Sequence, residues 1–484
     1  MIPRAFSYKA LLVAPLAAIV SACQAVPVTS EAPQSAILAG IWMTTANGDS
    51  RLERVELEAA PSGERRRVDV AINTDVRSQK MIGVGAAMTD ASAILFQDYL
   101  SADQRSDLFR ELFDPHTGLG LSFTRVVIGA SDFSSRHYSL DDTPYNQPDP
   151  NLEHFSFEPA EAAVLPMMKE ALQINPQLVV MATPWSPPAW MKTSDSLIKG
   201  TLRVDAYGSF SDYLVKSIGG FEAAGVHIDY VSLQNEPDFE PADYPGMRLS
   251  AEQRADLIGN YVGPAISRAG LSTKILDWDH NWDQPQQPLE VLSDPEAAAH
   301  VSGVAWHCYA GEVDAQELVR QQFPDKDVFF TECSGGEWSR EWPDAWSWMM
   351  KNLVIGSTRN WARGVLLWNL ALDENHGPHL GGCSDCRGVV TIDSETSNIN
   401  RNAEYYALAH YSKFVEPDAY RIDVDSSDPG VEAVAFQNPD GSVALIAFNS
   451  GEDDLTLDMK IAGQSWLVGI GQGSAITALI ELPE

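Results

Sequence analysis

The sequence predicts a (β/α)8 barrel with an attached β-sandwich, and three features of the chain support this fold class. Short apolar runs alternate with helix-forming segments through most of the chain. Strand patterns without helices occur after Pro417, and again before the first of the apolar runs. Runs that are apolar throughout are typical of strands buried on both faces, as parallel strands under helices are.

The barrel is predicted from eight apolar runs, each followed by a polar or helical stretch. They cover residues 82–88, 121–128, 178–182, 228–233, 274–278, 303–309, 328–331 and 364–370. Eight β/α units match a closed barrel, whose active site lies at the carboxyl ends of its strands. A doubly wound parallel sheet has the same periodicity, so the pattern alone leaves it open as an alternative.

The sandwich is predicted from strand patterns at both ends of the chain. Residues 431–437 and 442–448 flank the turn cluster Asn438-Pro439-Asp440-Gly441, which is typical of a hairpin. Further strands are expected at 54–57, 67–72, 455–461, 466–470 and 475–481. Because the upstream strands are too few to fold alone, we expect both ends to form one domain. The predicted divisions are 38–78 for the N-terminal strands, 79–412 for the barrel and 413–484 for the C-terminal strands.

The first 22 residues are predicted to be a secretory signal. Arg4 and Lys9 precede an apolar stretch at 10–20 that is too short to span a bilayer of roughly 30 Å. Val20-Ser21-Ala22-Cys23 resembles the lipobox of bacterial lipoproteins, in which the cysteine is lipidated. The resemblance implies an exported, cell-envelope lipoprotein facing the outer membrane or periplasm, or a secreted protein. Its only membrane contact would be a lipid anchor at Cys23, followed by a tether at 23–37; an ordinary signal peptide containing a cysteine is the alternative.

The overall charge argues against some partners. The chain has 67 acidic and 33 basic residues, a formal net charge of −34. Nucleic acids and anionic membranes are bound through clustered Lys and Arg, so neither is an expected partner.

Two of the predicted strands end in short motifs that contain a carboxylate. The fourth ends in Gln234-Asn235-Glu236-Pro237 and the seventh in Phe330-Thr331-Glu332-Cys333. Two carboxylates facing one pocket are what glycoside hydrolysis needs, one as acid and one to attack the anomeric carbon. A lone Glu at a strand end is more often solvated or a helix cap. Eleven of the 13 Trp lie between Trp185 and Trp368, where aromatic faces could stack on sugar rings or simply fill a core.

Eight stretches, in order along the chain, resemble glycoside hydrolase family 30, the retaining β-glycosidases that include glucosylceramidase and β-1,6-glucanases. They are Gly85-Ala86-Ala87-Met88-Thr89-Asp90, Ser131-Asp132-Phe133-Ser134, Thr183-Pro184-Trp185-Ser186-Pro187-Pro188-Ala189-Trp190-Met191-Lys192-Thr193, Gln234-Asn235-Glu236-Pro237, His307-Cys308-Tyr309, Thr331-Glu332-Cys333, Trp368-Asn369-Leu370-Ala371-Leu372 and His410-Tyr411-Ser412-Lys413-Phe414. The resemblance implies a retaining hydrolase of β-glucosidic bonds, either glucosylceramidase-like or directed at β-1,6-glucan. The alternative is a carbohydrate-binding lipoprotein that keeps the barrel without turnover.

The resemblance also implies roles for single residues. Glu236 would be the general acid/base and Glu332 the nucleophile, so Glu236 is expected to have the raised pKa and Glu332 to stay ionised. Substrate would be bound by Asp132, Trp185, Asn235, His307, Tyr309 and Trp368. Arg125 would hold the carboxylates in orientation or, equally well, form a structural ion pair.

No metal or cofactor is expected, because a two-carboxylate mechanism needs no Lewis acid. One pattern competes with this expectation: His376, His379, Cys383 and Cys386 have a spacing that could bind zinc. In an exported chain the C-x2-C pair could instead close as a disulfide.

Overall fold

The computed structural model describes residues 35–57 and 65–483. Cys23, the signal segment and most of the predicted tether lie outside these residues. Within them, no helix combines the length and the apolar character needed to cross a bilayer.

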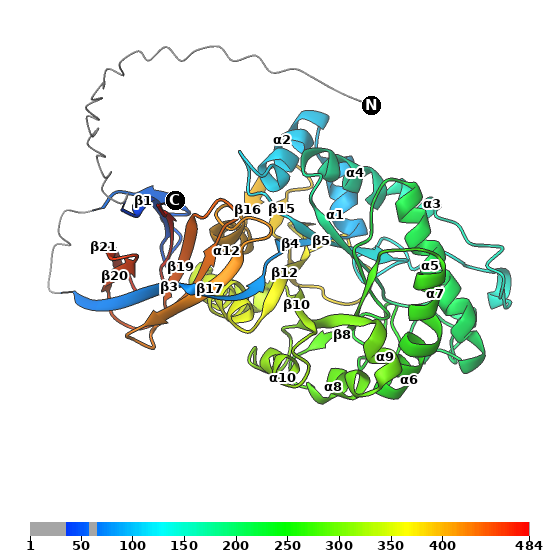
Figure 1. Ribbon diagram of the computed structural model, residues 1–484. Helices are drawn as coiled ribbons and strands as arrows, with labels where there is room; N and C mark the ends of the chain where they lie inside the picture. The colour runs from blue at the N-terminus through cyan, green and yellow to red at the C-terminus, as the bar shows by residue number, and fades with distance from the viewer. Residues whose placement is uncertain (1–34, 58–64, 484) are drawn as a thin grey trace, which may run out of the picture.

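All eight predicted barrel strands form one closed, parallel barrel (Figure 1). The strands are β4 (Gly83–Met88), β5 (Phe123–Ile128), β6 (Val179–Pro184), β7 (Tyr230–Ser232), β8 (Lys274–Asn281), β9 (Val301–His307), β10 (Asp327–Glu332) and β12 (Ala362–Asn369). Each strand pairs with the next along this series, and β12 closes the barrel by pairing with β4. Closure decides against the doubly wound alternative, in which the sheet would keep two open edges.

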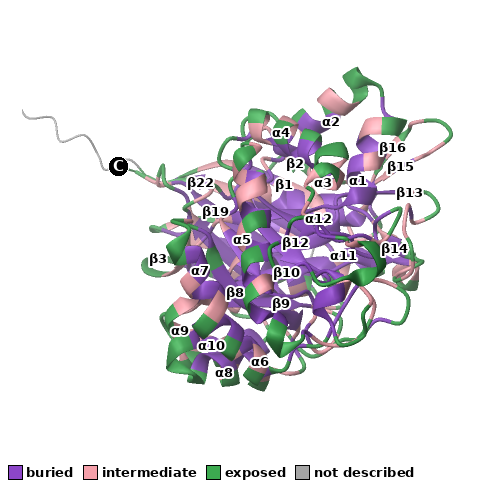
Figure 2. Ribbon diagram, turned by 90° about the vertical axis from the view of Figure 1, so that its right-hand side faces the viewer, coloured by how far each residue is buried: buried purple, intermediate pink, exposed green. Residues whose placement is uncertain are grey.

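Helices surround the barrel, and Figure 2 shows buried and exposed residues alternating along them while the barrel strands inside are mostly buried. They are α1 (Asp90–Ile94), α2 (Ala102–Phe113), α3 (Glu158–Ala162), α4 (Val164–Ile174), α5 (Tyr207–Ala223), α6 (Ala251–Asp256), α7 (Gly263–Arg268), α8 (Gln286–Ser293), α9 (Pro295–His300), α10 (Ala315–Gln322), α11 (Trp342–Trp348) and α12 (Ala403–Ser412). Between β12 and α12 lie the short strands β13 (Ala371–Asp373), β14 (Cys386–Arg387), β15 (Val390–Ile392) and β16 (Ile399–Arg401); β14 pairs with β11 (Gly335–Gly336).

Strands from both ends of the chain form one nine-stranded sheet, as the sequence predicts. Its order is β2 (Glu53–Val55), β1 (Ile37–Thr44), β22 (Ala475–Glu481), β19 (Val443–Asn449), β18 (Val431–Gln437), β17 (Tyr420–Ser426), β3 (Arg66–Lys80), β20 (Leu455–Ile461) and β21 (Gln464–Ile470). One buried cluster joins Ile41 and Ile476 from one half of the sheet to Leu457 and Ile470 from the other. The sheet therefore folds over its own core as a sandwich. The predicted hairpin at Asn438-Pro439-Asp440-Gly441 joins β18 to β19.

Inside the barrel, side chains form layers that prepare the site above them. The lower layer is apolar and receives one residue from each of seven strands: Phe123, Met181, Tyr230, Leu276, Ala305, Phe329 and Leu366. Because side chains alternate along a strand, the residue two positions later points into the next layer. In five strands that residue is polar: Arg125, Thr183, Ser232, His307 and Thr331. The barrel is thus closed below by an apolar layer and lined above it by hydrogen-bonding groups.

Candidate active site

A cavity of about 580 Å³ lies at the carboxyl ends of the barrel strands. It is lined by seven of the residues that the sequence predicts for the site: Asp132, Trp185, Asn235, Glu236, Tyr309, Glu332 and Trp368. These residues follow or lie at the ends of six different strands, so only the closed barrel brings them together.

Asp279 is the centre of the polar layer beneath this cavity. Its Oδ2 accepts hydrogen bonds from Arg125 at 2.7 Å and from Ser232 at 2.6 Å. Its Oδ1 accepts one from Thr331 at 2.7 Å and lies 3.0 Å from Nε2 of His307. Burial by itself raises the pKa of Asp279. The charge of Arg125 and the hydrogen bond with His307 lower that pKa by more than burial raises it, so the carboxylate stays ionised. The Thr183 hydroxyl also donates to Oδ2, at 3.3 Å, so one buried anion fixes groups from five strands.

A bulge in β8 turns Asp279 into the barrel. With regular alternation from Leu276, the next inward residue would be Trp278, and Asp277 and Asp279 would share the outer face. The pairing of β8 with β9 shifts register between Trp278 and His280, and the φ angles of Trp278 and Asp279 are 76° and 53°. As a result Asp277 pairs outward with Arg254, while Asp279 points inward. Such left-handed backbone costs about 1–3 kcal/mol per residue and clusters at functional sites.

Glu332 is held by two donors. Arg125 donates from Nη1 to Oε2 at 2.5 Å, and the Tyr309 hydroxyl donates to Oε1 at 3.0 Å. Arg125 also donates to Oδ1 of Asn235 at 2.9 Å and lies over the Trp185 ring. Arg125 is thus fully buried and forms an ion pair with Glu332, a geometry compatible with both interpretations from the sequence. Fixed donors on both oxygens keep Glu332 in a single orientation.

Glu236 faces two imidazoles. Its Oε1 lies 3.2 Å from Nδ1 of His307 and 3.5 Å from Nδ1 of His280. The same His307 nitrogen lies 3.9 Å from Oε1 of Glu332, so the two carboxylates face each other across one small space. The backbone of Glu236 has a φ of 48°, and its N–H donates to the carbonyl of Asp279. The bulge that turns Asp279 inward thus also supports the backbone of Glu236.

The pKa shifts run against the expectation from the sequence. Burial raises the pKa of Glu236, but the hydrogen bonds with His280 and His307 and their charges lower it more, and the net shift is downward. Burial raises the pKa of Glu332, and the opposing charges of His307 and Arg125 do not reverse this. Burial lowers the pKa of His307, but the charge of Glu332 and the bonds with Asp279 and Glu236 raise it, to about 9. Near neutral pH His307 is therefore the protonated partner of this pair and Glu236 the ionised one.

The other side of the cavity carries aromatic rings and a buried carboxyl. Trp185 and Trp368 stack with ring centroids 4.8 Å apart. Burial, together with the charge of Glu332, raises the pKa of Asp132 to about 8. Asp132 is therefore largely protonated near neutral pH and can both donate to and accept from a sugar hydroxyl. Gly382, with a φ of 68°, passes so close to Asp132 that a Cβ there would clash with its side chain.

His307 differs from its prediction as a substrate-binding residue. It is fully buried and lies behind Glu236, with both ring nitrogens facing carboxylates, and it does not line the cavity. Its inward place two residues after Ala305 in β9 puts it in the polar layer rather than in the cavity wall. In this structure His307 holds Glu236 and Asp279 in place and contributes a positive charge beneath the cavity.

Two residue groups could be considered for a metal. The zinc pattern loses its thiolates, because Cys383 and Cys386 form a disulfide. Among the described residues, Glu236, His280 and His307 have ligand atoms within 4.8 Å of one another. A metal needs a neutral imidazole, however, and a pKa of about 9 keeps His307 charged at neutral pH. This group suits proton chemistry better than metal binding.

Sequence reasoning missed Asp279, His280 and Trp338. Asp279 directly follows the predicted strand 274–278, so the rule that singles out Glu236 and Glu332 would also have selected it. Trp338 lines the cavity from a loop after β10, for which no strand-end rule exists.

Comparisons with known proteins agree with the fold and the site. A model described as "Glycosyl hydrolase family 30 TIM-barrel domain" matches residues 81–415, and "Glycosyl hydrolase family 30 beta sandwich domain" matches 418–478. An endo-1,6-β-D-glucanase of Trichoderma harzianum is 36% identical over 427 residues, covering 82% of this chain and 84% of that protein. The lysosomal acid glucosylceramidase of Mus musculus is 28% identical, covering 84% and 82%. A solved endo-β1,6-glucanase structure superposes with a TM-score of 0.85 at 32% identity, covering 92% of this chain and 99% of that one.

Proposed function

The chain belongs to glycoside hydrolase family 30, and we propose that it hydrolyses β-1,6-linked glucan, with Glu332 as nucleophile and Glu236 as general acid/base. The observation that carries the proposed mechanism is the opposed pair of carboxylates, joined through one His307 nitrogen. The linkage is supported by the relatives: an endo-1,6-β-D-glucanase is 36% identical, against 28% for a glucosylceramidase.

In the first step, the Glu332 carboxylate attacks the anomeric carbon. The bond from that carbon to the leaving oxygen breaks, its electron pair stays on the oxygen, and Glu236 supplies a proton to it. Arg125 and Tyr309 hold the attacking group in one orientation. The product is a glycosyl ester of Glu332.

In the second step, water attacks the same carbon from the face that the leaving group has vacated. Glu236 takes the proton from water, and the ester bond to Glu332 breaks, which returns Glu332 as a carboxylate. Two inversions give net retention. Protonated Asp132 and the stacked pair Trp185 and Trp368 would hold the sugar hydroxyls and ring.

His307 gives the acid/base its proton source. Because the imidazolium lies 3.2 Å from Glu236, the two groups share one proton and titrate as a pair. A sugar in the cavity excludes water and weakens the ionised form of Glu236, which favours transfer of that proton to it. Glu236 thus becomes the acid when substrate is bound.

The mechanism is tested by the first-formed product. Proton NMR of a β-glucoside digest should show the β-anomer first; initial release of the α-anomer would mean inversion and would remove Glu332 as nucleophile. With Glu332→Ala, azide should yield an α-glycosyl azide, because the small anion enters from the nucleophile's face. With Glu236→Ala, substrates with good leaving groups should still react in the first step, and azide should give the β-product.

The substrate is tested by a hydrolysis screen over β-1,6-glucan, glucosylceramide and aryl β-glucosides. We expect the highest kcat/KM on β-1,6-glucan. Turnover of aryl β-glucosides alone would contradict the β-1,6-glucan assignment. Complete inactivity, with carbohydrate binding intact, would favour the non-catalytic alternative, which nothing in the geometry supports because both carboxylates line one cavity.

We also propose that the protein is a lipoprotein of a bacterial envelope, anchored through Cys23. The support is Val20-Ser21-Ala22-Cys23 at the end of an apolar stretch. A lipid-modified N-terminus then replaces a membrane domain. Cys23→Ser should move the protein from the membrane fraction to the soluble fraction, and an unchanged distribution would show that Cys23 is not the anchor.

A further inference from the structure

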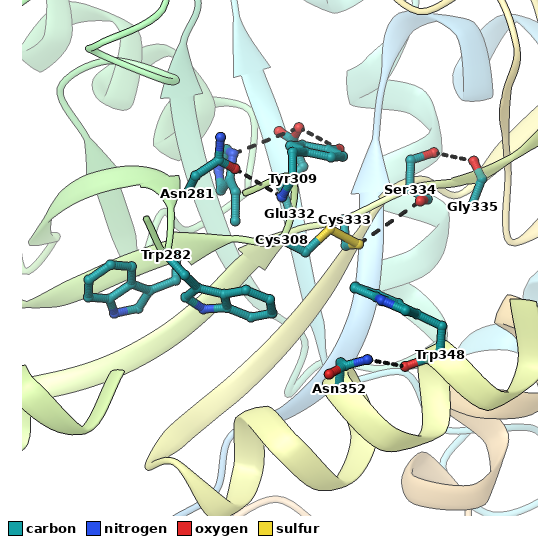
Figure 3. Close-up of a disulfide and its surroundings, with 12 residues drawn as sticks. Asn281, Trp282, Cys308, Tyr309, Glu332, Cys333, Ser334, Gly335, Trp348 and Asn352 are labelled. Carbon is teal, nitrogen blue, oxygen red and sulfur yellow. Dashed lines mark hydrogen bonds and ion pairs between the residues drawn. A yellow bond between two sulfur atoms is a disulfide. The ribbon is translucent and has the colours of Figure 1, made fainter. Parts of the chain in front are cut away.

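A second cavity of about 550 Å³ lies beside the catalytic one. Tyr309 and Trp338 line both cavities and form the wall between them. Beyond this wall, the second cavity is lined by Trp348, at the end of α11, and by both cysteines of the Cys308–Cys333 disulfide. Figure 3 shows Tyr309 and Trp348 on opposite sides of that disulfide. The second cavity therefore adjoins the catalytic one, and two aromatic residues line both.

The exposed tryptophans of the chain gather here. All 13 Trp lie in the described residues, and the two that are exposed are Trp338, at 57%, and Trp348, at 38%. Tyr309 adds a third exposed ring, at 44%. Large aromatic faces left in water within a concave site are typical of ligand binding rather than of core packing.

Polar groups lie among these rings. Ser334, Ser339 and Asp344 line the same cavity. Aromatic faces together with hydroxyl and carboxylate groups suit a sugar, which has apolar ring faces and polar edges. A lipid chain would not need the polar members, so this lining favours carbohydrate over a ceramide tail.

Tyr309 is held firmly in the wall between the cavities. The Tyr309 hydroxyl donates to Glu332, and its backbone N–H donates to Oδ1 of Asn281 at 3.0 Å. The disulfide joins the residue before Tyr309 to the residue after Glu332. A ligand in the second cavity would therefore sit at a fixed position relative to the nucleophile.

We propose that the second cavity binds glucosyl units of the glucan chain beyond the sugar held at the catalytic carboxylates, with Trp348 as its main stacking surface. This inference rests on the proposed β-1,6-glucan activity. Binding affinity should then depend on the length of the glucan chain, because a single glucoside fills only the catalytic cavity while a longer chain fills both.

The test measures binding against chain length in full-length Glu332→Gln protein, which cannot form the glycosyl enzyme. Calorimetry with β-1,6-gluco-oligosaccharides of increasing length should show affinity rising until both cavities are filled. Adding Trp348→Ala should weaken binding of the longer oligosaccharides by about three- to tenfold, since one aromatic stacking contact is lost. Trp348→Phe should restore most of it.

Trp361→Ala is the matched control. Trp361 precedes β12 at the other end of the barrel, where it packs against Arg320 and Arg421, so its loss should not change the dependence on chain length. In active protein, Trp348→Ala should lower the ratio of kcat/KM for a long oligosaccharide to that for an aryl β-glucoside, through KM. Asp344→Ala gives a second variant with the same expected direction.

The outcomes separate the two proposals. If the protein cleaves β-1,6-gluco-oligosaccharides but affinity depends neither on length nor on Trp348, the second cavity is not a sugar site and the proposed function stands. If the protein does not cleave them at all, the proposed function fails and this inference fails with it.

Discussion

Two fully buried histidines, in different parts of the molecule, are held in opposite charge states. In the polar layer below the catalytic cavity, both nitrogens of His307 face carboxylates, Glu236 and Asp279, so both must donate and the ring is an imidazolium. Where α12 meets the sandwich, both nitrogens of His410 face hydroxyls, those of Thr44 in β1 and Thr477 in β22. We call this second place the interdomain seam, formed by His410, Thr44 and Thr477.

The hydrogen bonds of the seam select the neutral ring. Thr477 donates to the backbone carbonyl of His410, so its oxygen accepts from Nδ1–H. Thr44 accepts from the N–H of Leu52, so its hydroxyl donates to Nε2. Burial lowers the pKa of His410 to about 3, whereas carboxylate neighbours raise that of His307 to about 9. Burial alone thus removes charge, and only the catalytic layer has the anions needed to restore it.

The largest expected effect comes from Asp279→Asn. This change would make the catalytic layer chemically more like the seam, because it removes one of the anions that face His307. Removing this anion takes from Arg125 and from His307 one of the carboxylates that each of them pairs with in the buried layer, so unfolding free energy should fall by about 3–5 kcal/mol. Activity should fall about 10²-fold or more, because the nucleophile and the acid both lose their positioning. Asp279 is a positioning residue, so the pH profile of kcat/KM should shift as well.

Asp277→Asn is the matched control for that experiment. It removes a buried partner of Arg254 on the same strand, but on the outer side of the bulge. We expect a comparable loss of stability with an unchanged pH profile. A shift of the profile in Asp277→Asn would show that the effect of Asp279 is merely structural.

The next prediction concerns how the free energy of unfolding changes with pH. His307 should cause a loss of stability on the alkaline side of the curve (the alkaline limb), and His410 a loss on the acid side (the acid limb). The folded pKa of His307, about 9, lies above the ordinary value of about 6.5, so its stabilisation is complete below pH 6.5 and is lost as pH rises through 9. The folded pKa of His410, about 3, lies below 6.5, so stability is lost as pH falls from 6.5 toward 3. Each limb contributes up to about 1.4 kcal/mol per pH unit.

Denaturant unfolding between pH 4 and 9.5 measures both limbs. His410→Gln should flatten the acid limb and leave the alkaline one, and His307→Gln should do the reverse. If either variant flattened both limbs equally, the assignment of a charged ring to His307 and a neutral ring to His410 would be contradicted.

A smaller effect is expected from Thr44→Val in the seam. The variant keeps the shape of the side chain but leaves Nε2 of His410 and the N–H of Leu52 without their partner, at a cost of about 1–3 kcal/mol. Thermal unfolding should show the loss, while kcat/KM of the remaining folded protein should not change. Reduced kcat/KM would mean that the seam and the catalytic layer are coupled.

The smallest expected effect is that of a chelator. The disulfide between Cys383 and Cys386 occupies two groups of the zinc pattern, and the remaining candidate includes a charged His307. Prolonged EDTA treatment should therefore leave both activity and stability unchanged. Stoichiometric zinc in the purified protein, lost together with activity, would overturn this.

Much of the architecture could be predicted because it depends on local pattern. All eight barrel strands were found from apolar runs, and the hairpin at Asn438-Pro439-Asp440-Gly441 from its turn residues. β1 and β17 were missed as strands. The apolar residues of β1 do not alternate regularly with polar ones, whereas those of β17 do, at Tyr420, Ile422 and Val424, so the same rule could have found β17. Their place in the sheet comes from partners that are far away in the sequence.

The carboxylates themselves were determined by the sequence, because a residue that ends a barrel strand faces the cavity wherever the strand lies in the barrel. Glu236 and Glu332 follow from that rule, and so does Asp279. What only the tertiary structure decided is the direction and charge of the groups around them. The bulge at Trp278 reverses Asp279 relative to Asp277, and a bulge depends on pairing with β9 rather than on the residues of β8 alone. The ionisation of His307 depends in the same way on anions from three other strand ends, because the charge of a buried group is set by its neighbours in space.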